Sequence, residues 1–319
     1  MIFLGIDTSC YTTSVAAVDE EGNLVSQQRR LLSVAEGERG LRQSEAFFKH
    51  VNNFPELYKA LLERVNPVNI AAVCVSTQPR GLSHSYMPVF FAGRRIAENI
   101  AMSLNVPLFA TDHQQGHIQA ALYGTDLSEN SFCAVHLSGG TTEVLSVQKQ
   151  ASEWKIKQLA ASKDINAGQL IDRLGVKMGM SFPAGKEVDK RACAFDGVRL
   201  TLPISASMED CSFSGTEAAA LRALEGGADP DALCEALMSA IARTLAKMAG
   251  GAAYYAGLRT VLMAGGVSSS AYLRQKLPVL FEQNGSACVV FSQPELSADN
   301  AVGVALLGRM KFLHKGMNE

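Results

Sequence analysis

Two histidines four residues apart, His113 and His117, are the residues of this chain whose type and spacing first suggest chemistry. Positions i and i+4 of an α-helix share one face, so both imidazoles can point toward one ion. Neutral imidazole is the commonest metal ligand in proteins. Near the end of the chain Asp299 stands at an expected strand-to-helix junction, where its carboxylate can complete a facial three-ligand site. The pattern predicts a transition-metal site formed by His113, His117 and Asp299.

Two alternatives for these residues remain open at this point. The histidines can be ordinary surface residues of a helix, and Asp299 can serve as the N-cap of the last helix. A zinc peptidase is another interpretation, because the two histidines have the spacing of the H-E-x-x-H motif. In that motif a glutamate beside the first histidine activates the metal-bound water. Gln114 stands at that position here, and its amide cannot take a proton. Peptide hydrolysis by that mechanism is therefore excluded.

Three loops rich in glycine and hydroxyl groups follow expected strands, at 5–10, 137–142 and 263–268. Backbone N–H groups in such turns bind phosphates, and paired glycines let the backbone approach an anion closely. The carboxylate of Asp7 in the first loop can hold a cation or a water. Each loop alone can be a simple turn. Three such loops at matching places predict a pocket for a phosphorylated ligand.

The elements that must position these loops occur twice. A strand at 2–6, its loop and a return strand at 14–18 are repeated about 130 residues later by strands at 132–137 and 143–147. Such a repeat predicts a duplicated α/β fold with two lobes and a cleft between them. We expect one lobe to comprise residues 1–112 and 296–319, and the other residues 113–295.

Helical periodicity fills the segments between these strands. Pro55 is expected to break or restart the first of these helices, because proline lacks an N–H and clashes with the preceding turn. The expected helices span 44–65, 88–104, 230–255 and 299–314, and the expected buried strands span 70–75 and 260–264.

Length and composition narrow the function classes. A chain of 319 residues suits two lobes, and a net charge of −2 excludes global attraction to nucleic acid. An RNA contact would need a partner's surface or a local basic stretch, for which the candidates are Arg29, Arg30, Arg39 and Arg42. The alternative, which the acidic balance of the chain favours, is that these arginines are ordinary solvated surface residues. Scattered cysteines, no basic signal sequence and no membrane-length apolar run lead us to expect a cytoplasmic protein.

Several ordered motifs together resemble the TsaD family of tRNA adenosine threonylcarbamoyltransferases, once described as glycoproteases. The opening motif Gly-Ile-Glu-Thr-Ser-Cys and the metal motif His-x-Glu-Gly-His have counterparts at 5–10 and 113–117. The remaining counterparts are Leu137–Gly140 for Val-Ser-Gly-Gly, Ala167–Arg173 for Ala-Gly-Glu-x-Phe-Asp-Lys, Phe182–Gly185 for Tyr-Pro-Gly-Gly, Ser212–Gly215, Met263–Ser268, and Ala298–Asn300 for Thr-Asp-Asn.

The resemblance implies an actin-like, sugar-kinase-like ATPase fold, with a ribonuclease-H-like core in each lobe and nucleotide and metal in the interlobe cleft. It implies transfer of threonylcarbamoyl from its adenylate to the exocyclic amine of the adenosine beside the tRNA anticodon. His113, His117 and Asp299 would bind iron or zinc, and Asp7 and Thr12 are the catalytic candidates. Implied partners are tRNA and other threonylcarbamoylation proteins, including a paralogous dimer partner and an ATPase. The residues implied to bind the adenylate or ATP-type nucleotide are Ser138, Gly139, Gly140, Asp172, Gly185 and Ser270.

This chain departs from the family pattern at several functional positions. Tyr11 and Thr12 stand where the family carries Asp and Glu, and Gln115 replaces the glutamate of the metal motif. Ser270 replaces an adenine-contacting asparagine, and Glu217 replaces a basic residue. The departures favour, as an alternative, a non-catalytic nucleotide-binding paralogue that acts as a scaffold. An ATPase or small-molecule kinase is less consistent with the sequence, because Mg²⁺ prefers oxygen ligands over two imidazoles.

Overall fold

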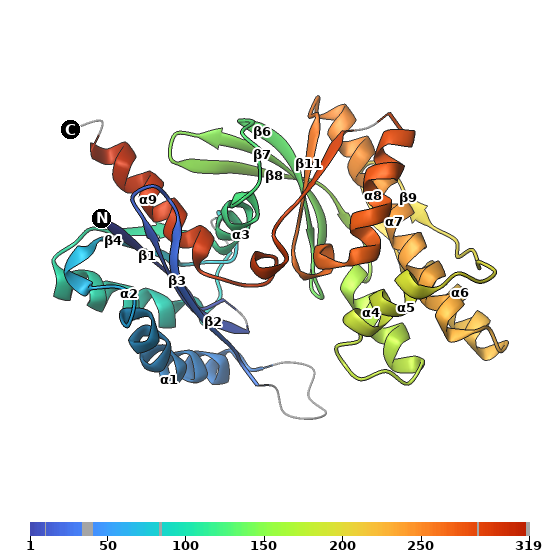
Figure 1. Ribbon diagram of the computed structural model, residues 1–319, viewed down its shortest axis with the longest axis horizontal. Coiled ribbons are helices and arrows are strands. Elements are labelled where there is room, and N and C mark those ends of the chain that lie inside the picture. Colours follow the sequence, from blue (N-terminus) through green and yellow to red (C-terminus); the bar gives the residue numbers. More distant parts are fainter. Residues whose placement is uncertain (10, 34–40, 83–84, 286, 317–319) are drawn as a thin grey trace. The chain divides into compact units, whose positions relative to one another are not determined.

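The computed structural model describes residues 1–9, 11–33, 41–82, 85–285 and 287–316, in which strands and helices form two α/β sheets with their covering helices (Figure 1). Cys10 and Arg39 lie outside these residues. The strands are β1 Ile2–Asp7, β2 Thr12–Asp19, β3 Leu24–Leu31, β4 Ile70–Ser76, β5 Leu108–Thr111, β6 Ser131–Leu137, β7 Thr142–Gln150, β8 Glu153–Ser162, β9 Ser205–Ala206, β10 Asp210–Ser212, β11 Thr260–Ala264 and β12 Cys288–Phe291. The helices are α1 Gln43–Leu62, α2 Phe90–Leu104, α3 His113–Leu122, α4 Ala167–Lys177, α5 Gly185–Ala194, α6 Ser214–Glu225, α7 Pro230–Tyr255, α8 Ala271–Gln283 and α9 Val302–Gly316, with short 3₁₀ turns η1 Pro67–Asn69, η2 Gly266–Ser269 and η3 Pro294–Leu296.

The first sheet has the strand order β3-β2-β1-β4-β5 in the described part of the chain. β1 pairs antiparallel with β2, and β2 pairs antiparallel with β3. β1 pairs parallel with β4, and β4 pairs parallel with β5. The N-terminal hairpin expected from the sequence therefore lies beside two parallel strands, so the carboxyl ends of β1, β4 and β5 meet at one edge.

Side chains of β1 alternate between the two faces of this sheet, as the two-residue period of a strand requires. Leu4 and Ile6 enter the core formed with Phe54 of α1 and Ala97 of α2. On the opposite face Phe3 meets the ring of Phe312 in α9 with ring centroids 5.4 Å apart. Asp7 has the same parity as Phe3, so its carboxylate emerges on the α9 side of the sheet.

The second sheet has the order β12-β11-β6-β7-β8-β10-β9 among the described residues. β6 pairs antiparallel with β7 and parallel with β11, which pairs parallel with β12. The five strands β8-β7-β6-β11-β12 thus repeat the arrangement of β3-β2-β1-β4-β5, which confirms the predicted duplication. The long helix α7 lies against this sheet, and its buried residues share one apolar core with β6 and β11.

The chain divides into two compact units: Met1–Tyr123 with Lys149–Trp154 and Ala298–Glu319, and Gly124–Gln148 with Lys155–Ser297. This division differs from the expected boundaries because α3 belongs to the first unit. α3 packs against α9, where a Cβ on Gly303 would lie 1.9 Å from the carbonyl oxygen of Gly116. Contact that close is possible only through glycine, and it fixes α3 to the first unit.

Two local expectations are wrong. Pro55 does not break α1, which runs continuously from Gln43 to Leu62. The proline lies on the exposed side of the helix, where water can hydrate the carbonyl of Val51 that its ring leaves unbonded, while Phe54 and Leu61 anchor the buried side. The last helix begins at Val302 and not at Asp299. No helix in the described ranges combines the length and apolar character needed to cross a bilayer.

Candidate functional site

The first turn of α3 is shaped by the residue that precedes it. Asp112 has extended backbone angles, and its side chain accepts a hydrogen bond of 2.9 Å from the backbone N–H of Gln115. Capping of this kind satisfies a donor that the helix itself cannot satisfy. α3 therefore begins at His113, directly after β5, and its i,i+4 geometry puts His113 and His117 on one face.

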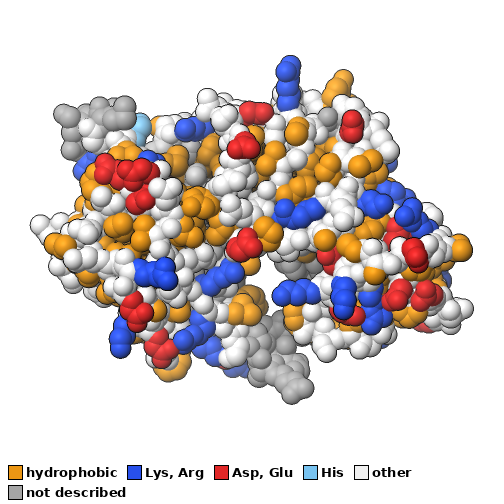
Figure 2. All heavy atoms as spheres, viewed as in Figure 1, with side chains coloured by type: hydrophobic (Ala, Val, Ile, Leu, Met, Phe, Trp, Pro, Cys, Tyr) orange, Lys and Arg blue, Asp and Glu red, His pale blue; other side chains and the backbone are white. Residues whose placement is uncertain are grey.

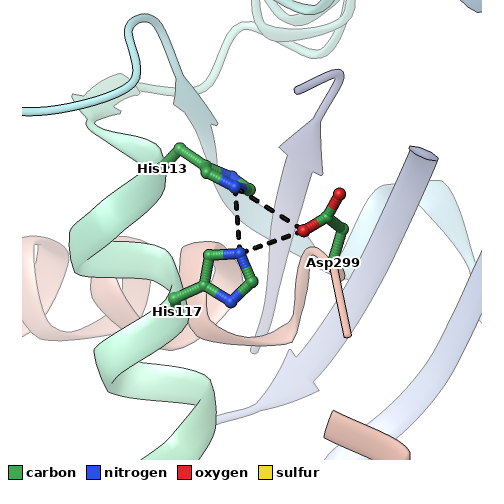
Figure 3. A group of neighbouring side chains, drawn as sticks. All are labelled: His113, His117 and Asp299. Atoms are coloured by element: carbon green, nitrogen blue, oxygen red, sulfur yellow. Dashed lines mark hydrogen bonds and ion pairs between the residues drawn. The ribbon is translucent and has the colours of Figure 1, made fainter. Parts of the chain in front are cut away.

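Asp299 meets these two rings, although 182 residues separate it from His117 (Figure 3). Nε2 of His117 lies 2.9 Å from Nε2 of His113 and 3.1 Å from Oδ1 of Asp299. The third side of the triangle, from Nε2 of His113 to Oδ1 of Asp299, measures 3.7 Å. All three residues belong to the first unit.

These separations are close to those expected for the donor atoms of a transition-metal site. Atoms that lie about 2.1 Å from one ion stand roughly 3.0 to 3.4 Å from each other in octahedral or tetrahedral geometry. Two imidazole nitrogens and one carboxylate oxygen at such spacing can bind iron or zinc. The side chain of Asp299 is 28% exposed, whereas that of His117 is 7% exposed. The triad is therefore more exposed on the Asp299 side than on the His117 side.

Asp7 lies against the Nδ1 side of the His113 ring. Its Oδ2 lies 2.9 Å from Nδ1 of His113 and accepts a 2.8 Å hydrogen bond from the Ser76 hydroxyl, while Oδ1 accepts from the Ser9 N–H at 2.7 Å. A carboxylate in this position favours a proton on Nδ1 of His113, so that the ring, when it is neutral, presents its lone pair at Nε2. On its far side, the ring of His113 meets Phe90 edge-on with ring centroids 6.2 Å apart.

The charges of this pair support each other. Burial by itself raises the pKa of Asp7, but the charge of His113 and the hydrogen bonds from His113 and Ser9 lower it below its ordinary value. Burial by itself lowers the pKa of His113, but the carboxylates of Asp7, Asp299 and Asp112 raise it to about 9. This strongly anionic surrounding attracts a cation, whether the cation is a proton on His113 or a metal ion.

Asp299 lies three residues before the start of α9, and its carboxylate meets the histidines. The Asn300 side chain accepts the 2.9 Å hydrogen bond from Val302 N–H at the start of that helix. α9 also lies close to β1, since a Cβ on Gly5 would lie 2.3 Å from the backbone nitrogen of Ala305. Glycines at both contacts thus bring the segment before α9 to the edge where β1 and β5 end.

Thr12, the other catalytic candidate, begins β2 and pairs with Leu31. It is 7% exposed, and its backbone N–H donates to Ser9 carbonyl oxygen at 3.1 Å. Tyr11, immediately before it, is 39% exposed. The structure therefore places the two positions where the family has acidic residues beside the Asp7 loop, but with a buried hydroxyl and an exposed phenol.

The predicted phosphate loop of the second unit is an open turn between β6 and β7. Ser138 N–H donates to Thr141 carbonyl oxygen at 2.8 Å, and Gly140 N–H donates to Oγ of Ser138 at 3.2 Å. A Cβ on Gly139 or Gly140 would meet nothing within 4 Å, so both glycines face open space where a ligand can approach. A Cβ on Gly168 would lie 2.7 Å from Ser138 carbonyl oxygen, which places the start of α4 against the loop.

Asp172 and Gly185 meet where α4 contacts α5. Oδ1 of Asp172 accepts a 2.8 Å hydrogen bond from Ala184 N–H, one residue before Gly185 begins α5. Burial raises the pKa of Asp172, partly offset by the N–H groups of Ala184 and Gly185. The carboxylate thus holds the end of the Phe182–Gly185 motif against α4.

Ser270 serves as the N-cap of α8, with its hydroxyl oxygen accepting from Leu273 N–H at 3.1 Å. The same hydroxyl donates to Asp189 of α5, whose carboxylate also accepts from Ala271 N–H at 2.9 Å and Tyr272 N–H at 3.1 Å. The six predicted nucleotide-binding residues therefore lie on elements connected through the loop–α4, α4–α5 and α5–α8 contacts.

Sequence reasoning missed three residues that organise these sites: Ser76, Gln115 and Asp189. Ser76 ends β4 and bonds Asp7, which the parallel pairing of β1 with β4 would have indicated. Asp189 has no sequence signal beyond its place on α5. Gln115 was noted only as a departure from the family pattern.

Comparison with solved structures agrees with the sheet topology. The crystal structure of HypF from T. kodakarensis matches 98% of this chain and 47% of its own, with a TM-score of 0.64 and 15% identity. A ROK family protein from Streptococcus pneumoniae matches both chains over 100%, with a TM-score of 0.59 and 11% identity. This likeness shows the fold, which is the predicted actin-like, sugar-kinase-like one.

Among curated relatives, the tRNA N6-adenosine threonylcarbamoyltransferase of Methanopyrus kandleri is 28% identical over 98% of this chain and 88% of its own length. A probable bifunctional tRNA threonylcarbamoyladenosine biosynthesis protein of Methanothermobacter thermautotrophicus is also 28% identical; the match spans 99% of this chain and 57% of that protein. The sequence profile of the TsaD family matches residues 30–306. The chain belongs to the TsaD family of tRNA N6-adenosine threonylcarbamoyltransferases.

Proposed function

We propose that this protein is a metal-dependent transferase that moves a threonylcarbamoyl group from threonylcarbamoyl-adenylate to the exocyclic amine of the adenosine beside the tRNA anticodon. The proposal is supported by the convergence of His113, His117 and Asp299, whose ligand atoms lie within 3.7 Å of one another, in a member of the TsaD family. In the reaction a new N–C bond forms, the bond between the carbonyl carbon and the phosphate oxygen breaks, and AMP leaves. The amine loses one proton to solvent. The products are the modified adenosine in tRNA and AMP.

The donor set fits an iron or zinc ion, which when bound would polarise the carbonyl and stabilise the leaving phosphate as a Lewis acid. His113 and His117 supply nitrogen ligands, and Asp299 supplies the carboxylate on the exposed side. Asp7 fixes the tautomer and orientation of His113 through Nδ1. Phe90, buried against the His113 ring, excludes water from that side of the ligand.

The adenylate is assigned to the loop and helix starts of the second unit. Gly139 and Gly140 leave their backbone accessible to a phosphate, and Ser138 holds the turn in shape. The start of α4 beside this loop adds the positive end of a helix dipole. Asp172, Gly185 and Ser270 complete the proposed nucleotide site, with Ser270 acting mainly through the fold because its hydroxyl caps α8.

For tRNA, the proposal relies on partner proteins more than on a basic face of this chain. Arg30, in the predicted basic stretch, is paired with Glu56 at 2.7 Å. Figure 2 shows Lys and Arg side chains interspersed with Asp and Glu on the visible face. Mixed charge of this kind gives little long-range attraction to a polyanion. We therefore include other threonylcarbamoylation proteins, among them a paralogous dimer partner and an ATPase, as the means of presenting tRNA.

The test is to incubate the metal-loaded protein with threonylcarbamoyl-adenylate and unmodified tRNA, with and without the partner proteins, and to digest the RNA to nucleosides. Mass spectrometry should detect N6-threonylcarbamoyladenosine for the wild type. His117→Ala and Asp299→Ala should lose the bound metal and the product together. If the metal-free variant that combines His117→Ala with Asp299→Ala still forms the product, the metal role is contradicted. If the metal-loaded wild type forms no product, tRNA as the acceptor is contradicted.

A non-catalytic nucleotide-binding paralogue is the second candidate, favoured by Thr12 and Tyr11 at the family's acidic positions. If the missing carboxylates are the defect, Tyr11→Asp with Thr12→Glu should create activity that the wild type lacks. Tyr11 is exposed and tolerates the change, while the buried Thr12 requires a stability control. An active wild type excludes this candidate.

A further inference from the structure

The amide of Gln115 occupies the position of the family glutamate, next to both histidines of the metal motif. Its Nε2 donates a 2.8 Å hydrogen bond to Oδ2 of Asp112, the cap of α3. Its Oε1 accepts a 3.1 Å hydrogen bond from the backbone N–H of Trp154. Gln115 is buried, with 9% of its surface exposed. One side chain thus connects the first turn of α3 with its cap and with a segment 39 residues later.

That segment, residues 149–154, comprises the end of β7, the turn and the first two residues of β8, and it belongs to the first unit. Trp154 is 8% exposed, and its indole N–H donates to Oε1 of Gln119 at 2.8 Å, one turn further along α3. The two bonds differ in what they hold. The Gln119 bond holds the indole of Trp154. The Gln115 bond holds the Trp154 backbone against the start of α3, where His113 and His117 lie.

The hydrogen bonds at position 115 need a side chain with both a donor and an acceptor, because the two partners of Gln115 differ. Trp154 N–H needs an acceptor, and the Asp112 carboxylate needs a donor. Glutamine offers one of each, while an ionised glutamate has acceptors only. A glutamate in the same rotamer would place a second carboxylate oxygen beside Oδ2 of Asp112, with repulsion in a buried setting. Glutamine in place of the family glutamate therefore suits the Asp112 carboxylate, and the change is more than the loss of an acidic group.

We propose that Gln115 is a positioning residue of the metal site: through Asp112 and the Trp154 backbone it fixes the orientation at which the first turn of α3 presents His113 and His117. The proposal rests on the proposed metal role of these histidines. Metal ligands held from behind in this way bind their ion more tightly, because less orientational freedom is lost when the ion enters.

The test is Co²⁺ titration of the wild type, of Gln115→Leu and of the near-isosteric Gln115→Glu. Binding is monitored by the d–d absorption spectrum and by the fluorescence of Trp154, the only tryptophan of the chain. Both Gln115 variants should bind Co²⁺ roughly 10- to 100-fold more weakly, with an altered d–d band. Gln119→Leu is the matched control, because it removes the other Trp154 bond on the same helix. It should keep the Co²⁺ affinity within about two-fold and leave the d–d band unchanged.

A double variant that exchanges the two groups adds a rescue that a purely structural loss would not produce. In Asp112→Asn with Gln115→Glu, the new amide donates, the new carboxylate accepts, and asparagine still caps α3. The pair should return the Co²⁺ affinity to within about three-fold of wild type. Folded Gln115 variants with wild-type affinity and spectrum, an equal loss in Gln119→Leu, or no rescue would overturn the positioning role alone. A wild type that binds no Co²⁺ would overturn the proposed metal site and the positioning role with it.

Discussion

Oδ2 of Asp7 lies 2.9 Å from Nδ1 of His113, although the two residues are 106 positions apart. Asp7 ends β1 and His113 begins α3 after β5, so the contact exists because β1, β4 and β5 run parallel and end at the same edge. The carboxylate is almost fully buried and held by Ser9 and Ser76, and can therefore act only on the ring beside it. The burial of Asp7 thus favours the proposed role, in which it orients His113, over direct contact with a substrate.

Replacing the Asp7 carboxylate by an amide tests this role. Asp7→Asn keeps the shape but removes the negative charge that stabilises Nδ1–H, so the affinity for Zn²⁺ should fall about 10- to 100-fold. The pKa of His113 should also fall from its raised value, because the largest favourable interaction of its charged form is lost. Zn²⁺ competition titration and NMR of the His113 ring measure the two effects. Ser76→Ala, which removes only one bond to Asp7, serves as the control, and equal affinities for Asp7→Asn and wild type would contradict the role.

The glycine contact between α3 and α9 predicts a stability and binding effect. A Cβ at position 303 would lie 1.9 Å from Gly116 carbonyl oxygen and 2.6 Å from Ala120 backbone nitrogen, so Gly303→Ala must force the helices apart. We expect a loss of about 1–3 kcal/mol in the free energy of unfolding, with weaker metal binding, because Asp299 moves relative to the histidines. Denaturant titration measures the first effect and metal titration the second.

Gly316→Ala is the matched control on the same helix, since a Cβ there would meet nothing within 4 Å. It should be neutral or slightly stabilising. If Gly303→Ala unfolds at the same denaturant concentration as Gly316→Ala, the close approach of α3 and α9 is not as described.

His50 predicts a pH-dependent contribution to stability. It is fully buried on α1, its Nδ1 lies 2.8 Å from the Thr13 hydroxyl, and among the described residues its Nε2 has no hydrogen-bond partner. Burial, only partly offset by the charge of Asp7, lowers the pKa of His50 to about 4. In the unfolded chain the pKa is near 6.5, so between these values the unfolded state binds more protons.

The free energy of unfolding should therefore fall as the pH is lowered from about 6.5 to about 4, by up to about 3 kcal/mol from this residue. Above that window the contribution is fully present. His50→Gln, which keeps a polar group near Thr13, should flatten this part of the curve in denaturant titrations at several pH values. Curves that stay parallel for wild type and variant across the window would show that His50 is not the titrating group.

Glu217 predicts a change in anion affinity. The family has a basic residue here, but in this chain Oε2 of Glu217 lies 3.5 Å from a guanidinium nitrogen of Arg173, the residue after Asp172. Glu217→Lys removes the pair and adds a positive charge, so AMP should bind roughly 3- to 10-fold more tightly at low salt, with the gain lost as salt is added. Equilibrium dialysis measures it. Glu217→Gln, which only frees Arg173, should give a smaller gain, and an unchanged AMP affinity in both variants would place this pair outside the nucleotide site.

Much of the fold was readable from local patterns. The paired strand–loop–hairpin segments predicted two related sheets, and the helix at 230–255 was predicted with the bounds that α7 has. Such elements follow from hydrophobic periodicity and turn residues, which act over a few positions. Pro55 was misjudged because the cost of a proline depends on which side of α1 faces water, and that is decided by packing against β2 and β3.

The sequence alone determined the residue types of the candidate metal centre, since the i,i+4 spacing of His113 and His117 already puts both rings on one face. Only the tertiary structure decided that Asp299 joins them and that the Asn300 side chain accepts from Val302 N–H at the start of α9. It also decided that Asp7 holds His113 and that Gln115 connects Asp112 with Trp154. The physical reason is range: helix periodicity is local, whereas these contacts depend on the parallel order of β1, β4 and β5 and on glycines that let α9 approach α3 and β1.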